Sequence, residues 1–206
     1  MKVILLAAMT RDRVIGHSGA CEHCSGSGYE PTGQGALCGN CLGGYTDPPK
    51  RIDVPPEVES WIEQRTRDAC VLHGRIAWEY LPESSPLRRW REHIVLTSDV
   101  SDSPPGPREC LRAASMADAI GWASQQRKDL CVLGGERTYR SAIPFADELD
   151  LQILDHYVEG DRLFPEARAL LASMSCIAFG EHAFSLQTYV NDQSLGVHRE
   201  LWRRIW

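Results

Sequence analysis

One stretch of the sequence decides the fold: Leu130-Cys131-Val132-Leu133-Gly134-Gly135-Glu136-Arg137-Thr138-Tyr139. Its apolar run predicts a buried strand that breaks at the two glycines and continues as a helix. Without a Cβ, Gly134 and Gly135 would let the backbone approach a ligand, and the N–H groups of the helix would face an anion. The stretch indicates a dinucleotide site, although a glycine pair after a strand is more often only a turn.

Length and charge restrict the class of protein. The chain has 206 residues, 43% of them hydrophobic, and a formal net charge of −6. This is enough for one hydrophobic core, so we expect a single soluble domain over residues 1–206. The negative charge and the lack of a long basic run argue against duplex nucleic-acid binding as the main function. The sequence leaves both a monomer and a homodimer open.

The N-terminus has an apolar run, Met1 to Met9, that stops at the charged turn Thr10 to Arg13. The run is too short to span a membrane and predicts a first, central strand rather than a signal peptide. Apart from one closely spaced group of four, the cysteines are scattered in apolar or helical settings, which is typical of reduced thiols: Cys70, Cys110, Cys131 and Cys176. We therefore expect a cytoplasmic protein.

The segment 17–50 is rich in Gly, Ser and Pro and contains two C-x-x-C pairs thirteen residues apart: Cys21, Cys24, Cys38 and Cys41. Four thiolates in this arrangement satisfy tetrahedral Zn²⁺, and the small residues after each pair permit the turns of a zinc knuckle. Two disulfides in a secreted loop are the alternative, and a nucleic-acid-binding ribbon is disfavoured because no Lys or Arg lies between the first and last cysteine. We expect a structural zinc site in an inserted loop.

The rest of the chain alternates between strand and helix patterns and ends in a predicted hairpin. A helix should start near Asp53, a possible cap, and another after the cap Ser115. The hairpin would join Ala183–Val190 to Arg199–Trp206 through a long connection. The remaining strands are expected at Val3–Ala8, Cys70–Arg75, His93–Leu96, Leu130–Leu133 and Leu149–Leu154. This order predicts a mixed, mostly parallel α/β sheet.

Two charged residues open predicted helices. Glu57 lies in a first turn, four residues before Trp61, so both side chains can face one cavity; the simpler interpretation is a favourable contact with the helix dipole. Arg75 follows the strand that ends at Gly74 and could bind a phosphate, or could be a surface charge at a helix start.

Several ordered motifs point to a known family: Leu6-Ala7-Ala8 with Asp12-Arg13-Val14-Ile15-Gly16, Gly74-Arg75 with Trp78-Glu79, Ile94 to Ser98, Val132 to Gly135 with Tyr139, and Val158 to Asp161 with Phe164-Pro165. They resemble the dihydrofolate reductase family over nearly the whole chain outside residues 17–53. The resemblance implies an eight-stranded, mostly parallel sheet flanked by helices, with a C-terminal antiparallel hairpin. Residues 17–50 would be a zinc-binding insertion in the catalytic loop.

The resemblance also implies NADPH as cofactor. Gly74, Arg75 and Ser98 match positions at the 2'-phosphate side, and Gly134, Gly135 and Tyr139 match the pyrophosphate and nicotinamide contacts. Ala7, Ala8 and Ile15 match the floor under the nicotinamide and the pterin. The other cofactor-binding residues expected by this resemblance are Gly16, Thr97, Leu133, Arg137 and Thr138.

For the substrate, the resemblance implies 7,8-dihydrofolate, reduced to tetrahydrofolate. Glu57 looks like the family's single pocket acid, which orients the pterin and favours protonation of N5 by water. Arg91 corresponds to the arginine that binds the α-carboxylate of the folate glutamate. The other substrate-binding residues expected are Leu6, Ala8, Trp61, Tyr139 and Gln152.

The chain departs from the family's pattern at the acid position and at residue 152. Counting back from Thr66 without a gap puts Val58, not Glu57, at the acid position, and Glu59 is a further candidate. Gln152 stands where the family usually has Thr. A reductase of another pterin-like or pyrimidine heterocycle therefore remains an alternative, and so does a non-catalytic module that binds through the zinc loop.

Overall fold

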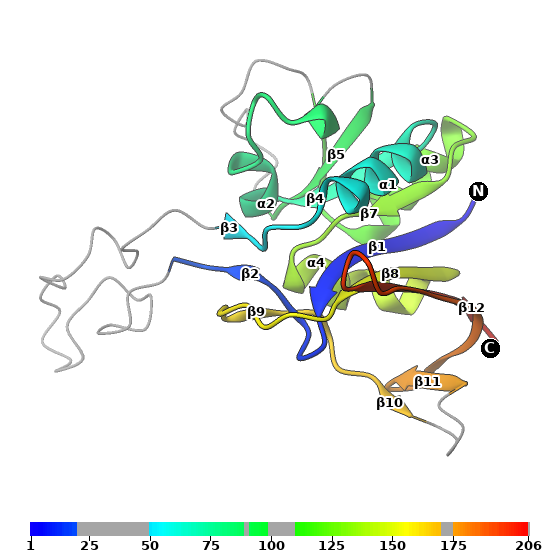
Figure 1. Ribbon diagram of the computed structural model, residues 1–206. Helices are drawn as coiled ribbons and strands as arrows, with labels where there is room; N and C mark the ends of the chain where they lie inside the picture. The colour runs from blue at the N-terminus through cyan, green and yellow to red at the C-terminus, as the bar shows by residue number, and fades with distance from the viewer. Residues whose placement is uncertain (20–49, 89–90, 99–109, 170–174, 206) are drawn as a thin grey trace, which may run out of the picture.

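The computed structural model describes residues 1–19, 50–88, 91–98, 110–169 and 175–205 (Figure 1). The four cysteines predicted to bind zinc lie outside the described residues. Within the described ranges, no helix combines the length and apolar character needed to cross a membrane.

A ten-stranded sheet forms the centre of the molecule, in the order β10-β11-β12-β13-β8-β1-β7-β4-β5-β6. Its strands, in chain order, are β1 (Val3–Thr10), β4 (Cys70–Gly74), β5 (Glu92–Leu96), β6 (Leu111–Ala113), β7 (Leu130–Val132), β8 (Glu148–Leu154), β10 (Arg168–Ala169), β11 (Cys176–Phe179), β12 (His182–Asp192) and β13 (Val197–Arg204). A second sheet joins the short strands β3 (Lys50–Arg51), β2 (Val14–His17) and β9 (Arg162–Leu163).

The expected count of eight strands is wrong for this sheet. The strands β10 and β11 pair antiparallel beyond the C-terminal hairpin and extend that edge of the sheet. They are two and four residues long, too short to give a periodic hydrophobic pattern in the sequence. The predicted hairpin itself is confirmed as β12 and β13. Its connection, 193–196, is short rather than long, because both strands extend further than expected.

The centre of the sheet is parallel, as expected. β1 pairs in parallel with β7 and β8, and β4 pairs in parallel with β5 and β7. β8 is buried along its whole length, which is typical of a strand covered on both faces. The hairpin strand β13 runs antiparallel to β8, and the change from parallel to antiparallel pairing in the sheet occurs between these two strands.

Helices cover both faces of the sheet (Figure 1). The alternation of β1 divides the core: Leu5 and Ala7 pack with α3 and α4, whereas Leu6 and Ala8 lie on the face that α1 covers. The helices are α1 (Pro56–Thr66), α2 (Arg75–Glu79), α3 (Met116–Gln125) and α4 (Glu136–Ala142), with 3-10 turns at Pro86–Arg88 and Ile143–Phe145.

Two residues were predicted to cap helix N-termini, and the structure tests both predictions. Ser115 is confirmed: its hydroxyl accepts a hydrogen bond from the Asp118 N–H, and the Asp118 carboxylate accepts one in return from the Ser115 N–H. Asp53 is wrong as a cap, because α1 begins at Pro56 with Pro55 as the N-cap residue and no side-chain hydrogen bond. Proline has its φ fixed near the helical value, so the start needs no polar cap.

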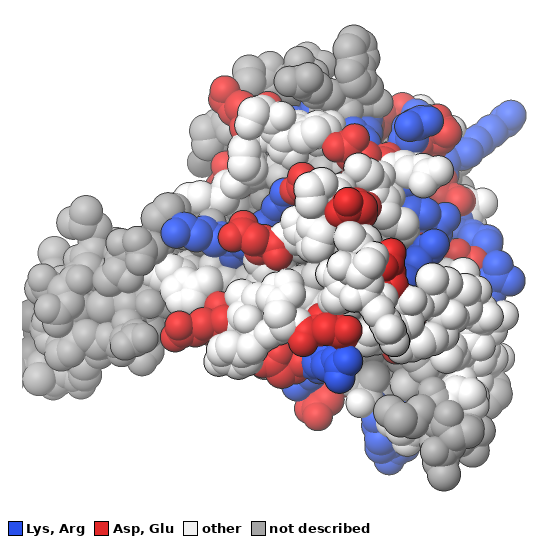
Figure 2. Space-filling view, viewed as in Figure 1, with Lys and Arg blue, Asp and Glu red and all other residues white. Residues whose placement is uncertain are grey.

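Charges of both signs are mixed on the face of the molecule seen in Figure 2. Among the described residues on that face, Lys and Arg alternate with Asp and Glu instead of forming one continuous basic area.

Candidate functional site

The predicted cofactor residues gather at the carboxyl edge of the parallel strands. Gly74 ends β4, and its N–H donates a 2.7 Å hydrogen bond to the carbonyl of Gly134, which follows β7. Thr97 follows β5, the neighbour of β4. In open α/β sheets, ligands bind in the crevice at this edge. Chain segments as much as sixty residues apart therefore meet where a dinucleotide would be expected.

The two glycines of the pair have different surroundings. Gly134 has a φ of +89°, and a Cβ there would lie 2.5 Å from Cε2 of Tyr139, so the ring fills the space that a side chain would need. Gly135 has nothing within 4 Å of its ideal Cβ position. The peptide bond between them is cis. Gly134 is thus required by packing, whereas the open side of Gly135 is where a ligand could approach the backbone.

Tyr139 and Thr138 are buried in the fold beside the glycines. The Tyr139 hydroxyl donates a 2.7 Å hydrogen bond to the carbonyl of Leu6, and burial raises the pKa of this phenol above its ordinary value. Thr138 packs against Gly74, where a Cβ would lie 2.5 Å from the threonine Oγ1. Both side chains therefore hold β1, β4 and α4 together at the candidate cofactor site.

The charged candidates of the cofactor site lie at the surface. Arg75 is exposed and pairs with Glu79 one helical turn later, at 2.8 Å from Nη1 to Oε1. Ser98 and Arg137 are also exposed, and Thr97 is half-buried. An exposed i,i+4 ion pair contributes little to stability, so Arg75 could exchange Glu79 for a phosphate at small cost.

The strand β2 places Ile15 and Gly16 within the second sheet. The Ile52 N–H donates to the Ile15 carbonyl at 3.3 Å. A Cβ on Gly16 would lie 2.5 Å from the Lys50 carbonyl oxygen, so only glycine allows β3 to pair so closely. After β2, the carboxylate of Asp161 accepts hydrogen bonds from the N–H and the hydroxyl of Ser18.

The β1 residues predicted to line the floor under the nicotinamide and the pterin lie on both faces of this strand. Leu6 and Ala8 lie on the α1 face, together with Trp61 and Leu133. Ala7 lies on the opposite face, among the residues that pack with α3 and α4, so only its backbone can contact a ligand on the α1 side.

The three candidates for the pocket acid have distinct environments. Glu57 is exposed and lines a cavity of about 170 Å³ together with Gln152. Val58, the position reached by gap-free counting, is buried and packs in the cluster that includes Ala8. Glu59 forms an ion pair with Arg51 and borders a different, smaller hollow. Of the two glutamates, Glu57 is the one that lines a cavity with Gln152.

Arg91 is held by the end of α1. Its guanidinium donates to Thr66 Oγ1 at 2.9 Å and to the carbonyls of Glu63 and Pro86 at 3.1 and 2.8 Å. Burial lowers the pKa of Arg91 from its ordinary value. The side chain is thus fixed in direction, which suits an arginine that binds a carboxylate but equally suits one that braces a helix.

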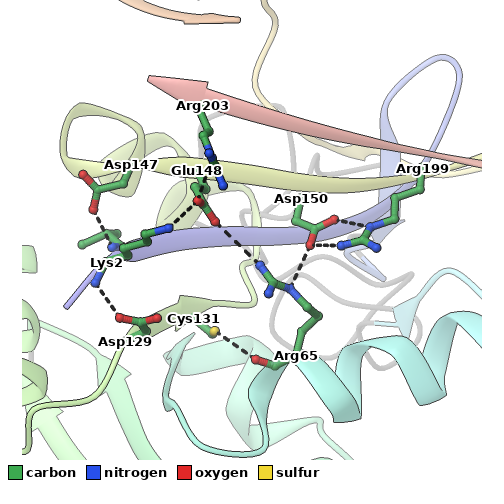
Figure 3. Close-up of polar contacts among 10 residues, drawn as sticks. Lys2, Arg65, Asp129, Cys131, Asp147, Glu148, Asp150, Arg199 and Arg203 are labelled. Carbon is green, nitrogen blue, oxygen red and sulfur yellow. Dashed lines mark hydrogen bonds and ion pairs between the residues drawn. The ribbon is translucent and has the colours of Figure 1, made fainter. Parts of the chain in front are cut away.

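Sequence reasoning missed a group of buried charges between α1, β8 and β13 (Figure 3). Asp150 is completely buried and accepts two hydrogen bonds from Arg199, and its Oδ2 lies 2.9 Å from Nε of Arg65. Glu148 binds Lys2 at 2.7 Å and Arg203 at 3.1 Å. The sequence did contain a signal for these ion pairs, because acidic residues lie on one strand and basic residues on its neighbour. They are Glu148 and Asp150 on β8, and Arg199 and Arg203 on β13.

The predicted zinc site lies outside the described residues. In the part of the chain that the structure describes, no group of three or more His, Cys, Asp or Glu side chains could hold a metal ion. The four scattered cysteines are free thiols, as expected, and burial raises the pKa of Cys70 and Cys131 to about 12.

The sequence is similar to those of several proteins that are named dihydrofolate reductase. The dihydrofolate reductase of Neisseria gonorrhoeae is 30% identical over 126 residues, which are 61% of this chain and 72% of that protein. The dihydrofolate reductase of Buchnera aphidicola from Acyrthosiphon pisum is 25% identical over 111 residues, which are 54% of this chain and 65% of that protein.

A solved structure has the same fold. The dihydrofolate reductase of Enterococcus faecalis, described as complexed with NADP(H) and RAB-propyl, superposes with a TM-score of 0.61 at 20% identity. The superposition covers 100% of this chain and 97% of that one.

Fold and site define an α/β protein in which a glycine pair lies at the carboxyl edge of a mostly parallel sheet. A sequence model described as dihydrofolate reductase matches residues 52–175. The chain belongs to the dihydrofolate reductase family.

Proposed function

We propose that this protein reduces 7,8-dihydrofolate to 5,6,7,8-tetrahydrofolate with NADPH. The proposal is supported by membership of the family and by relatives that are named dihydrofolate reductase. The observation that carries it is the cavity lined by Glu57 and Gln152. Gln152 is paired in register with Ala8, so the cavity that Glu57 lines reaches the strand next to the apolar floor on which a planar heterocycle would lie.

The residues at the carboxyl edge would hold the cofactor. The open side of Gly135 admits a pyrophosphate to the backbone, and Arg75 with the hydroxyls of Thr97 and Ser98 would bind the 2'-phosphate. NADPH supplies the hydride when bound. The neighbour from Enterococcus faecalis is described with NADP(H), which agrees with this choice of cofactor.

Glu57 would act on the substrate rather than on the hydride. Its carboxylate would accept hydrogen bonds from the amino and ring N–H groups of the pterin and so fix the ring against the cofactor. A negative charge at that edge raises the basicity of the pterin N5, which water can then protonate as the hydride arrives at C6. Catalysis would thus depend mainly on orientation.

A second candidate is the reduction of another pterin-like or pyrimidine heterocycle by the same fold. It is favoured by Val58, which is buried at the position that gap-free counting assigns to the acid. The discriminating residue is Arg91, which would bind the tail of a folate and would have no substrate role for a heterocycle without a tail.

The experiment compares acceptors. Purified protein is mixed with NADPH and dihydrofolate, and the loss of NADPH absorbance is followed together with the formation of tetrahydrofolate. Turnover of dihydrofolate at a higher kcat/KM than of the same ring system without the glutamate tail supports the first function. Turnover of the tailless heterocycle alone, unaffected by Arg91→Met, would replace the first function with the second.

We also propose that Cys21, Cys24, Cys38 and Cys41 bind a structural Zn²⁺ within an inserted loop of a single cytoplasmic domain. The support is the spacing of the two C-x-x-C pairs. Metal analysis of the purified protein should give one zinc per chain, and replacement of Cys38 and Cys41 by Ser should abolish it. Unchanged zinc content in this variant would refute the assignment.

A further inference from the structure

The strand β12 extends well beyond the strand that pairs with its outer side. β12 comprises His182–Asp192, and β13 pairs with residues 184–192 on one side. On the other side, β11 pairs only with residues 182–185. In Figure 1, β10 and β11 accordingly lie beside the start of β12, away from its hairpin end. Within the described ranges, no strand pairs with the outer edge of residues 188–192.

An irregularity in β12 marks the point where the pairing with β11 ends. The Leu186 N–H still donates a 2.9 Å hydrogen bond to the Ser175 carbonyl. The register with β13 then shifts between Leu186 and Thr188, as in a β-bulge, which bends a strand and often terminates pairing. Residues 187–192 are exposed, and for 188–191 the described part of the chain supplies backbone partners from β13 only. The outer N–H and C=O groups are therefore available to a further strand.

The free part of this edge lacks the features that normally prevent strand pairing. Residues 188–191, Thr-Tyr-Val-Asn, carry no charge, and three of the four are β-branched or aromatic. Tyr189 and Val190 are each 54% exposed. The two terminal strands of the sheet, in contrast, are two and three residues long and contain Arg168 and Arg112. Short strands and charged side chains protect a sheet edge, so the unprotected edge of β12 indicates a contact surface.

A second copy of the same chain suits this edge. Two identical strands that meet around a two-fold axis run antiparallel, and such an arrangement is closed, so it stops at two copies. Because residues 188–191 are uncharged, self-pairing puts no like charges opposite each other. Recognition of a different protein usually depends on complementary charges, and this segment offers none. The composition therefore favours a second copy over a charged partner.

The position of Asp192 selects the register of the pairing. A two-fold axis at Tyr189 puts Tyr189 opposite the same residue of the second copy and Thr188 opposite Val190. The two Asp192 carboxylates are then six positions apart along the strands, which is about 20 Å. An axis at Asn191 would bring the two carboxylates within two positions of each other, where they would repel. The register centred on Tyr189 is therefore favoured, with aromatic and β-branched residues in its cross-strand pairs.

Tyr189 lies on the face of the sheet opposite to the cavity that Glu57 lines. It is paired with Glu200 of β13, which is paired in turn with Leu151 of β8. Leu151 packs in the cluster that contains residues of α3 and α4, and Tyr189 does not line the cavity. A substitution at Tyr189 therefore changes the strand edge and leaves the candidate substrate site intact.

We propose that the chain forms a two-fold symmetric homodimer in which the edges of β12 pair antiparallel around Tyr189 and join the two sheets into one. A contact restricted to one strand edge is smaller than the roughly 800 Å² per partner of a standard stable interface. The dimer should therefore be weak and depend on concentration. This proposal concerns a surface outside the candidate site and does not rest on the proposed function.

The test is sedimentation equilibrium of the full chain at about 1–300 µM, which covers weak specific association. The mass of the wild-type protein should rise with concentration from one chain of 23.0 kDa toward two. Tyr189→Lys and Tyr189→Glu each put like charges opposite each other and should raise the dissociation constant by about 10-fold or more. An equimolar mixture of the two variants should associate again. The matched control is Tyr157→Lys, at a tyrosine that is 79% exposed outside β12, and it should not change the dissociation constant.

Three results would overturn the dimer: wild-type protein that stays monomeric at about 300 µM, association that neither Tyr189 variant weakens, or a mixture of the two variants that stays monomeric. If a variant fails to fold, hydrogen exchange of the wild-type protein decides. The amides of residues 188–191 should exchange more slowly at high than at low protein concentration, because the paired edge is protected. Equal exchange at both concentrations would refute the pairing.

Discussion

Asp150 and Arg199 are joined by two parallel hydrogen bonds across β8 and β13, although they lie 49 positions apart in the chain. Asp150 is completely buried, and the side chain of Arg199 is 34% exposed. The bond pattern is bidentate, so it fixes the direction of the guanidinium as well as its distance. This pair joins the parallel part of the sheet to the C-terminal hairpin and fixes one wall of the cavity beside Glu57.

Asp150→Ala should destabilise the protein by about 3 kcal/mol, because it leaves two arginines, Arg65 and Arg199, without their buried partner. The free energy of unfolding in urea measures this. Arg203→Ala is the control: its side chain is 54% exposed, so the loss should stay below about 1 kcal/mol. Equal losses in the two variants would contradict the role assigned to burial of Asp150.

Gly134→Ala should destabilise by about 2 kcal/mol or more, since an alanine would adopt a φ of +89° and would clash with the Tyr139 ring. Thermal unfolding checks the prediction. Gly121→Ala in α3 is the matched control, because nothing lies within 4 Å of its ideal Cβ. That variant should gain about 0.5–1 kcal/mol from the higher helix propensity of alanine. A stable Gly134→Ala protein would refute the packing requirement.

Gly135→Ala separates ligand binding from folding. A Cβ at this position meets no atom within 4 Å, so the melting temperature should change little. The same Cβ would stand where the pyrophosphate is proposed to approach, so the dissociation constant for NADPH should rise by about 10-fold or more. Calorimetric titration with NADPH measures this dissociation constant. An unchanged dissociation constant would mean that the cofactor does not bind against Gly135.

His73 should make the folded state sensitive to acid. It is buried beside His93, Trp78 and Arg88, and burial, followed by the charges of His93 and Arg88, lowers its pKa from 6.5 to about 3. Between pH 6.5 and about 3, His73 therefore binds a proton in the unfolded chain but stays neutral in the folded chain. The contribution of neutral His73 is complete above pH 6.5 and is lost as the pH falls from 6.5 toward 3, by about 1.4 kcal/mol per pH unit.

The measurement for His73 is the free energy of unfolding at several pH values, compared between wild-type protein and His73→Met. The variant lacks the titrating group, so its stability should fall less steeply below pH 6.5. Parallel curves for the two proteins would mean that other groups cause the acid sensitivity.

Much of the fold was predictable because it depends on local patterns. The apolar run before Gly134 gave a buried strand, and Ser115 gave a helix start that the structure confirms. The edge strands β10 and β11 were not predictable, because two and four residues carry no period. Asp53 failed as a cap because Pro55 and Pro56 already define the first turn.

Only the part of the candidate site that lies within one continuous segment could be predicted from the sequence. The glycine pair and Tyr139 lie in one stretch, and the structure brings them together with Gly74. The Asp150 and Arg199 pair depends on the register between two distant strands, which sequence periodicity does not fix. The choice among Glu57, Val58 and Glu59 also depends on how one helix turn faces the sheet, and it stays a prediction.

The most direct test of the account is the rate of NADPH oxidation with dihydrofolate in wild-type protein, Glu57→Gln and Glu59→Gln. The two glutamates lie in the same turn of α1, but only Glu57 lines the cavity with Gln152. We predict that kcat/KM falls by about 100-fold or more in Glu57→Gln and by less than about 3-fold in Glu59→Gln. Full activity in Glu57→Gln, or no turnover of dihydrofolate by the wild-type protein, would contradict the proposed function.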